Sequence, residues 1–546
     1  MKRMLGISIL LLGIPVSARA QHEQHAAGTA PEQLGTVKFE TSCAPEVGAD
    51  FNRAVALLHS FEYGPATATF NKVLERDHSC AVAYWGIALC NWTNPFGGIK
   101  AGPLLERGRT TVEKGLATGS PTPRERAYIA AVAELYKDAD KVPHRDRTLA
   151  YARAMEGVQR DYPQDIEARI FYALALNQTA VPTDKTYAAQ LETASILEPL
   201  WKQYPDHPGL PHYIIHAYDH PPLAAKALEA ARRYAKIAPS APHALHMPSH
   251  TFTRVGSWKE SVETNIASEQ TALKQNVIGE ALHAMDYQAY AYLQMAQDRK
   301  ALAVGERMPA VLAKWDPAAF SGAATGFAGG YAAAAIPARY ALERSAWSDA
   351  AALQPRTTPF PHVDAVTHFA RALGAARSGK AADARPDLDR LTALRDKLKG
   401  MNDAYWSEQV DIQYRVADAW LAYAEGRKAE AVQMLRAAAD AEDATDKSAV
   451  SPGPLAPARE LLGDMLLDAG QAKDALVAYE ATMKKEPGRF RGAYGAARAA
   501  ETAGDRAKAR ELYGRLLTIA QSADGDRPEL QRARTFVKTS DERLDF

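Results

Sequence analysis

Two stretches near the C-terminus decide the fold: DAGQAKDALVAYEATMKKEP at residues 468–487 and TAGDRAKARELYGRLLTIAQ at residues 502–521. The first contains a Gly, an Ala and a Tyr that recur 34 residues later in the second, as Gly470/Gly504, Ala475/Ala509 and Tyr479/Tyr513. Self-similarity at a fixed period of this size is typical of repeat proteins. From residue 47 onward, apolar residues recur at helical spacing between Gly, Pro and Asp clusters, so the sequence predicts helices throughout.

This pattern resembles the tetratricopeptide repeat (TPR), in which two helices occupy 34 residues. Leu462 and Gly463 stand where the first helix of a TPR carries its Leu-Gly pair, and Pro487 closes the repeat. The resemblance implies an all-α TPR superhelix, an α-solenoid of about 12 helix-turn-helix repeats with a concave groove. We expect repeats to start near residues 47, 81, 122, 165, 208, 242, 282, 331, 365, 412, 456 and 490.

The composition excludes several classes of protein. The chain has 546 residues, and its 65 Lys and Arg balance 65 Asp and Glu, which argues against general nucleic-acid binding. Hydrophobic content of 47 % and charged content of 24 % indicate a globular chain. Apolar runs within the repeats are too short for a membrane span.

The N-terminus predicts export. Lys2 and Arg3 precede an apolar stretch at residues 4–16 and the cleavage pattern Ala18-Arg19-Ala20. These features are typical of a cleaved signal peptide, here at residues 1–20, and predict a periplasmic or secreted protein. The remaining chain is expected to comprise an N-terminal tail at 21–46, TPR-like repeats at 47–205, His-rich TPR repeats at 206–300, an irregular helical segment at 301–360, TPR repeats at 361–525 and a C-terminal tail at 526–546.

Cys43 and Cys80 occupy matched places ahead of the first helices of two successive repeats. Those helices are expected to be parallel neighbours, so their N-termini should lie within disulfide reach. An exported protein can keep such a bond. We therefore expect a Cys43–Cys80 disulfide, and Cys90 as a buried apolar residue.

Histidine is concentrated in one part of the chain. Of 15 histidines, eight lie between residues 207 and 283, where even spreading would place about two. In the TPR register, seven of the eight and two aspartates fall at groove-lining positions of first helices. This predicts a His/Asp-rich site in the groove, whose expected metal ligands are His212, His216, Asp219, His220, His243, His246, His250, His283 and Asp286.

Histidines at i and i+4 lie above one another on a helix, so the pairs His212/His216 and His246/His250 can reach one ion. Imidazole with carboxylate suits a divalent transition metal such as zinc, copper or iron. We expect these four histidines to share one site. The open alternative is that some of them pack against aromatic side chains. Pro248, inside the first helix of its repeat, predicts a kink within the cluster.

Arg254 and Tyr287 are the expected ligand-binding residues beside the histidines. Arg254 is a fixed cation that could attract a small anionic ligand, or form a salt bridge with Glu260 or Asp286. The Gly- and Ala-rich segment 318–335 is expected to be either a loose helix or a flap.

Two functions remain open from the sequence. The first is an exported binding protein whose groove holds a peptide, a protein partner or a small anionic ligand. In its most specific form, this hypothesis includes a metal ion bound by the groove histidines. The second is a metal-dependent enzyme, a hydrolase or an oxidoreductase, built on the TPR scaffold. No catalytic residue is assigned, because no Glu follows His212 or His246 as a zinc-protease motif requires.

Overall fold

The computed structural model describes residues 31–541 apart from residues 101, 320 and 321. The expected signal peptide at 1–20 lies outside these residues. From Gln33 onward the chain forms one compact unit, and the fold below is that of this unit.

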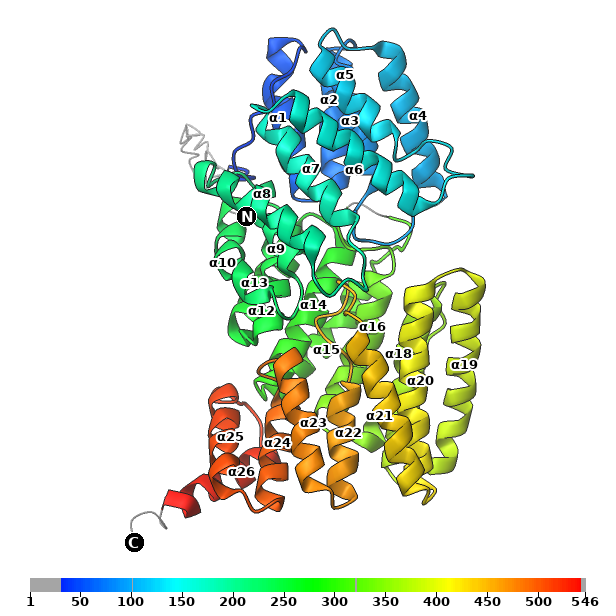
Figure 1. Ribbon diagram of the computed structural model, residues 1–546, viewed down its shortest axis with the longest axis vertical. Coiled ribbons are helices and arrows are strands. Elements are labelled where there is room, and N and C mark those ends of the chain that lie inside the picture. Colours follow the sequence, from blue (N-terminus) through cyan, green and yellow to red (C-terminus); the bar gives the residue numbers. More distant parts are fainter. Residues whose placement is uncertain (1–30, 101, 320–321, 542–546) are drawn as a thin grey trace, which may run out of the picture. The chain divides into compact units, whose positions relative to one another are not determined.

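The described chain is all-α and consists of twelve helix pairs that follow one another in sequence order (Figure 1). The first helices are α1 (Gly48–His59), α3 (Val82–Trp92), α5 (Pro123–Ala133), α7 (Ile166–Gln178), α9 (Gly209–Tyr218), α11 with α12 (Pro242–His246, Pro248–Val255), α14 (Ile278–Gln294), α16 (Ala328–Glu343), α18 (Pro361–Arg377), α20 (Ala404–Ala424), α22 (Ala458–Asp468) and α24 (Phe490–Thr502).

Their second helices are α2 (Tyr63–Arg76), α4 (Pro103–Thr118), α6 (His144–Asp161), α8 (Ala188–Gln203), α10 (Leu228–Ile237), α13 (Trp258–Lys274), α15 (Asp298–Leu312), α17 (Trp347–Ala351), α19 (Arg385–Gly400), α21 (Lys428–Ala444), α23 (Ala472–Lys485) and α25 (Arg506–Ile519). Short 3₁₀ helices lie at Pro45–Val47, Ala224–Ala227 and Ala381–Ala384. The described residues contain no strand. The predicted all-α TPR-type solenoid is confirmed.

The repeat residues act through close helix packing. Tyr479 is buried, and a Cβ on Gly463 or on Gly495 would lie within 2.7 Å of its ring. Only residues without a side chain let the ring fit between the two first helices. Gly470 and Gly504 end their helices with φ of +77° and +84°, which a glycine adopts without strain.

The predicted register holds well in the N-terminal half and drifts in the middle. First helices begin at Gly48, Val82 and Gly209, each within a residue of the prediction. The largest shift is at α20, which begins at Ala404 rather than near 412. It starts earlier because the side chain of Asp403 caps it, accepting a hydrogen bond from the Trp406 amide at 3.1 Å.

The predicted C-terminal tail at 526–546 is wrong for most of its length. Helix α26 (Pro528–Asp541) packs on α25. Its residues Leu530, Ala533 and Phe536 are buried, and their spacing places them on one helical face. This helix covers the apolar face that the last repeat would otherwise expose.

The predicted N-terminal tail at 21–46 also needs correction in its described part. Leu34 and Phe39 are buried, and the Phe39 ring lies 5.2 Å from that of Trp85. Cys43 and Cys80 form a disulfide with Cα atoms 4.8 Å apart. The segment is therefore docked on the first repeats by apolar contacts and a covalent bond. Cys90 is a buried free thiol.

The segment expected to be irregular, 301–360, holds most of α15 together with α16 and the short α17. Gly329 and Gly330 in α16 receive the Trp315 indole, and a Cβ on Gly329 would lie 2.6 Å from it. The C-terminal part of the Gly- and Ala-rich stretch is thus a packed helix, since α16 begins at Ala328.

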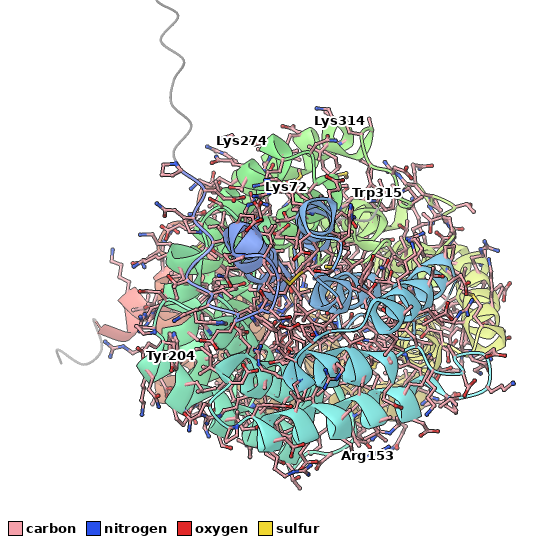
Figure 2. The ribbon with its side chains drawn as sticks, turned by 90° about the horizontal axis from the view of Figure 1, so that it is seen from above. Lys72, Arg153, Tyr204, Lys274, Lys314 and Trp315 are labelled. Atoms are coloured by element: carbon pink, nitrogen blue, oxygen red, sulfur yellow. A yellow bond between two sulfur atoms is a disulfide. The ribbon has the colours of Figure 1, made fainter. Side chains whose placement is uncertain are left out.

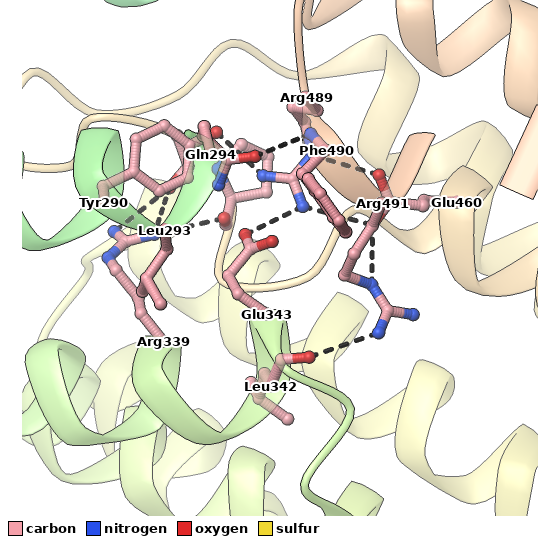
Figure 3. Close-up of polar contacts among 12 residues, drawn as sticks. Tyr290, Leu293, Gln294, Arg339, Leu342, Glu343, Glu460, Arg489, Phe490 and Arg491 are labelled. Carbon is pink, nitrogen blue, oxygen red and sulfur yellow. Dashed lines mark hydrogen bonds and ion pairs between the residues drawn. The ribbon is translucent and has the colours of Figure 1, made fainter. Parts of the chain in front are cut away.

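A buried ionic network joins α14, α16, α22 and α24 (Figure 3). The Arg489 guanidinium is fully buried, 2.8 Å from the Glu343 carboxylate and 3.1 Å from that of Glu460, and it donates to the Tyr290 hydroxyl at 2.8 Å. Removing one partner of such a network leaves an uncompensated buried charge, so the network fixes these helices together.

Other charged side chains lie on the surface. The labelled Arg153, Lys274 and Lys314 extend outward at the periphery (Figure 2). In the part of the chain that the structure describes, no helix combines the length and apolarity needed to cross a membrane.

Candidate metal centre

Six of the predicted histidines come together in the interior of the protein, from α9, α11, α12 and α14. They form two groups of three, and within each group one nitrogen of every ring lies within 4.8 Å of the others. The first group is His212, His216 and His243, and the second is His246, His250 and His283. All are buried except His216, which is half-buried.

The i, i+4 pairs form the base of each group. The Nε2 atoms of His212 and His216 lie 3.1 Å apart, as do those of His246 and His250. The helix that carries the second pair is divided at Met247, ahead of Pro248, into α11 and α12. The ring of Pro248 removes a backbone donor at this point, as the sequence predicted.

The hydrogen bonds of the second group fix its tautomers. His250 Nδ1 lies 3.0 Å from Asp219 Oδ2, and a carboxylate only accepts, so this nitrogen carries the proton. His246 Nδ1 lies 2.7 Å from Asn265 Oδ1. The Asn265 amide nitrogen donates to the Ser261 carbonyl, so its oxygen faces His246. Both Nε2 atoms therefore carry lone pairs, and these face each other across 3.1 Å.

The first group has a similar arrangement. His212 Nδ1 donates to the His59 carbonyl at 2.6 Å, which leaves its Nε2 as a lone pair toward His216. Neither ring nitrogen of His243 has a hydrogen-bond partner. Its backbone amide donates to Glu62 at 3.1 Å, and its Nδ1 lies 3.9 Å from a Glu280 carboxylate oxygen.

The four histidines expected to share one site are thus divided between two groups that adjoin. Each i, i+4 pair is completed by a third histidine from another helix, His243 for the first pair and His283 for the second. Ring centroids of His216 and His250 lie 6.4 Å apart. Because His243 and His246 are three positions apart on α11, that helix contributes one ligand to each group.

Burial favours the neutral form of five of these imidazoles, those of His212, His216, His246, His250 and His283. Desolvation and neighbouring imidazoles hold the pKa of His212, His216 and His246 well below the ordinary value. Desolvation lowers the pKa of His283 to about 3. Neutral imidazole is the form that binds metal. Next to the cluster, burial and the charge of Glu280 raise the pKa of the Glu62 carboxyl to about 8.

Asp219 and Arg254 support the cluster instead of lining an open rim. Arg254 is buried, and its Nε donates to Asp219 Oδ1 at 2.9 Å while Nη2 donates to the Asp219 carbonyl. Asp219 in turn orients His250. The salt bridge of Arg254 is therefore made with Asp219 and not with the expected Glu260 or Asp286, whereas its anion-binding role stays a prediction.

Besides Asp219, two other predicted ligands lie outside both groups. Asp286 pairs with the buried Arg339 at 2.9 Å. His220 lies at the end of α9, with Nδ1 3.6 Å from an Asp446 carboxylate oxygen. Pro221 and Pro222 follow it directly and the helix ends at Tyr218, so His220 does not continue the helical face of His212 and His216.

The cluster is covered by the chain itself. On one side the Phe61 ring contacts His212, with centroids 4.4 Å apart. On the other side lies the segment 445–457, between α21 and α22. The Tyr287 hydroxyl donates to the Ala449 carbonyl at 3.0 Å, and its ring lies 4.6 Å from that of His246. Near these histidines, the open groove expected for a peptide or protein partner is therefore filled.

Two further groups have ligand-type residues within the same distance. Cys43, Asp77 and Cys80 form one, but both thiols are consumed by the disulfide. His59, Glu167 and His207 form the other, and each of their ring nitrogens has a partner. Their residues are thus satisfied within the protein.

Sequence analysis missed the residues that orient or flank the histidines: Asn265, Glu62, Glu280, Lys447 and the His59 carbonyl. They lie on other helices or far along the chain, and none belongs to a motif. Only Asn265 could have been found from the sequence, because it lies on α13, the second helix of the repeat whose first helix carries His246.

The comparisons with known proteins add little to this geometry. No protein-family model and no curated protein matches the chain. Among solved structures, it is similar to the APC/C hetero-tetramer Cut9-Hcn1, at 12 % identity over 90 % of this chain and 89 % of that chain, with a TM-score of 0.32. It is also similar to Naa15/Naa10 bound to HypK-THB, at 11 % identity over 91 % and 80 %, with a TM-score of 0.23. Function must therefore be argued from the site.

Proposed function

We propose that this helical-repeat protein binds two transition-metal ions, one in each three-histidine group. The observation that carries the proposal is the pair of Nε2 lone pairs of His246 and His250, which face each other at 3.1 Å while both Nδ1 atoms donate to oxygen acceptors. Two buried lone pairs at this distance repel each other unless a cation lies between them. Protonation of either ring is opposed by burial.

The surrounding contacts support the same conclusion. Metal-binding histidines typically donate their second N–H to a carboxylate, an amide or a backbone carbonyl, which orients the ring and raises its basicity. Asp219, Asn265 and the His59 carbonyl provide three such acceptors. Three imidazoles without a thiolate suit zinc, copper or iron.

The proposed compartment is the periplasm or the cell exterior. The Cys43–Cys80 disulfide supports it, since such bonds persist in oxidising surroundings.

The alternative of a metal-dependent enzyme is favoured by one feature: three protein ligands leave a coordination position open, as in catalytic zinc sites.

Elemental analysis of the purified full chain tests the proposal. After loading with zinc or copper and removal of free ions, we expect two equivalents per chain. The matched control His362→Phe, which alters a buried histidine outside the cluster, should keep both. Retention of no ion by the folded wild-type protein would overturn the proposal, and the six histidines would then be packing residues.

A further inference from the structure

Arg147, on α6, is a buried cation that no carboxylate of the described chain offsets. Four other arginines are buried there, and each forms an ion pair: Arg254 with Asp219, Arg339 with Asp286, Arg489 with Glu343 and Glu460, and Arg527 with Asp298. Arg147 is only 3 % exposed, yet among the described residues no Asp or Glu pairs with it. Because a buried charge without a counter-charge is costly, this arginine lacks a partner that the others have.

The N–H groups of Arg147 are only partly used. Its Nε donates to the Val142 carbonyl at 3.2 Å, and its Nη1 donates to the Leu135 carbonyl. The guanidinium carbon also lies 5.6 Å from the centre of the Trp92 ring, whose face attracts a cation. These contacts orient the side chain but leave Nη2 without an acceptor in the described chain. A guanidinium is a planar fork of donors that matches a carboxylate.

Two further basic side chains lie beside Trp92. The His144 ring, one turn before Arg147 on α6, stacks on Trp92 with centroids 5.1 Å apart, and its buried Nδ1 has no hydrogen-bond partner. Lys100 belongs to the loop that follows Trp92, and its Nζ donates to the Asn94 carbonyl at 2.6 Å. Three basic side chains therefore gather near the end of α3 with no acidic partner among the described residues.

The ionisation of these groups agrees with the contacts. Burial lowers the pKa of Lys100 to about 7. Burial lowers the pKa of His144 to about 4, and the charges of Lys100 and Arg147 contribute to this shift. Burial also lowers the pKa of Arg147. No carboxylate of the described chain contributes to any of the three shifts, so a bound anion would meet no competing negative charge.

The cavity next to these side chains is mainly apolar. Trp92 and Tyr151, which lies one turn after Arg147 on α6, line a cavity of about 30 Å³ whose walls also include Leu58 and Phe171. Since one water-sized group needs about 10–15 Å³, this cavity suits a short alkyl group and is too small for an aromatic ring. A ligand that fits both features has a small apolar part and an anionic head.

We propose that Arg147 binds the carboxylate of a small aliphatic organic acid, with Lys100 and His144 as neighbouring donors. The carboxylate gives Arg147 the kind of partner that the other buried arginines already have, and the alkyl part lies against Trp92 in the cavity. This binding site goes beyond the proposed function and is independent of the metal ions. Inorganic phosphate offers the same charge without an apolar part, so it is the informative comparison.

Propionate labelled with ¹³C at its carboxyl carbon is the probe. NMR titration of the chelator-treated full chain should show saturable binding, with propionate held more tightly than inorganic phosphate in competition. Arg147→Met should weaken propionate binding about 10- to 100-fold, because it removes hydrogen bonds to a charged group and keeps most of the apolar stem. Arg153→Met is the matched control, since Arg153 lies on the same helix and extends outward at the periphery (Figure 2). It should bind propionate as the wild type does.

Three outcomes would overturn the inference: no saturable propionate binding by the folded wild-type chain, equal affinity in folded Arg147→Met, or phosphate bound as tightly as propionate. If Arg147→Met does not fold, as judged by circular dichroism, Lys100→Met takes its place, because Lys100 is half-buried in a loop. This variant should weaken propionate binding about 2- to 5-fold, and an unchanged affinity would contradict the inference. None of these measurements involves a metal ion, so the proposed function is tested separately.

Discussion

Two buried groups of this protein each bring three ligand-type side chains together, and they differ in how their histidine nitrogens are used. In the group of His59, Glu167 and His207, the carboxylate accepts from both Nε2 atoms, at 2.8 and 3.0 Å. The opposite nitrogens also have partners: His59 Nδ1 accepts from the Tyr213 hydroxyl, and His207 Nδ1 accepts from the Gly209 amide. Every donor meets an acceptor, and no ion is needed.

In the group of His246, His250 and His283, one nitrogen of each pair member donates to oxygen and the other faces a second lone pair. Both groups place three ligand-type atoms within 4.8 Å, so proximity does not distinguish them. The balance of hydrogen-bond donors and acceptors does distinguish the two groups. A complete balance marks a structural group, and converging lone pairs mark a cation site.

The largest effect is expected from removing ligands of the second group. His246→Ala with His250→Ala should abolish one of the two metal equivalents, because loss of two ligands weakens binding by more than about 10⁴-fold, each ligand exceeding the 10- to 100-fold of an orienting residue. Competition with a chelator of known affinity measures this. His216→Ala with His250→Ala should weaken both equivalents. A single shared site would instead lose everything in both double variants.

Glu167→Ala tests the other group, that of His59, Glu167 and His207, which we interpret as structural. It should lower the free energy of unfolding by about 3–5 kcal/mol, because two buried histidines lose their common acceptor. Urea denaturation measures the change, and two metal equivalents should remain in the folded fraction. The control Glu113→Ala removes an exposed partner of Arg109 and should cost well under about 1 kcal/mol. Loss of a metal equivalent in Glu167→Ala would contradict the division into structural and metal-binding groups.

Asn265→Ala tests whether the orientation of the His246 ring contributes to metal affinity. Without the amide oxygen, His246 loses the acceptor that fixes its tautomer, so one equivalent should bind about 10- to 100-fold more weakly and the other should be unchanged. Isothermal titration calorimetry resolves the two classes of site. Asn177→Ala, at a buried amide of α7, should leave both affinities intact. Equal weakening of both classes would mean that Asn265 acts through general packing.

His362 is a third kind of buried histidine, with neither nitrogen hydrogen-bonded and its ring stacked on Trp406 at 4.3 Å. Desolvation lowers its pKa to about 3 in the folded protein, whereas the unfolded chain titrates near 6.5. The unfolded state therefore takes up a proton first as the pH falls, and stability is lost below about pH 6.5 at about 1.4 kcal/mol per pH unit. Between pH 7 and pH 5, His362→Phe should lose about 2 kcal/mol less than the wild type in urea unfolding. Identical losses would place the acid sensitivity elsewhere.

Much of the architecture could be predicted from local sequence. The 34-residue spacing of Gly470, Tyr479 and their repeats is enough to indicate helix pairs, because these residues act on helices next to them in the chain. The drift of register at α20 arises from a capping side chain, Asp403, which the repeat pattern does not include. The docked N-terminal segment and α26 were missed because they lie outside any repeat.

The sequence alone determined that histidines are concentrated on three successive first helices and that His212/His216 and His246/His250 face the same way, because i, i+4 geometry is a property of one helix. Only the tertiary structure decided how these residues are grouped. The relative rotation of neighbouring helices brings His243 to the pair His212/His216 and His283 to the pair His246/His250. It also brings Arg254 into hydrogen-bonding distance of Asp219. A segment about 200 residues further along the chain brings Lys447 to the cluster. Such contacts depend on packing between elements, for which a repeat period carries no information.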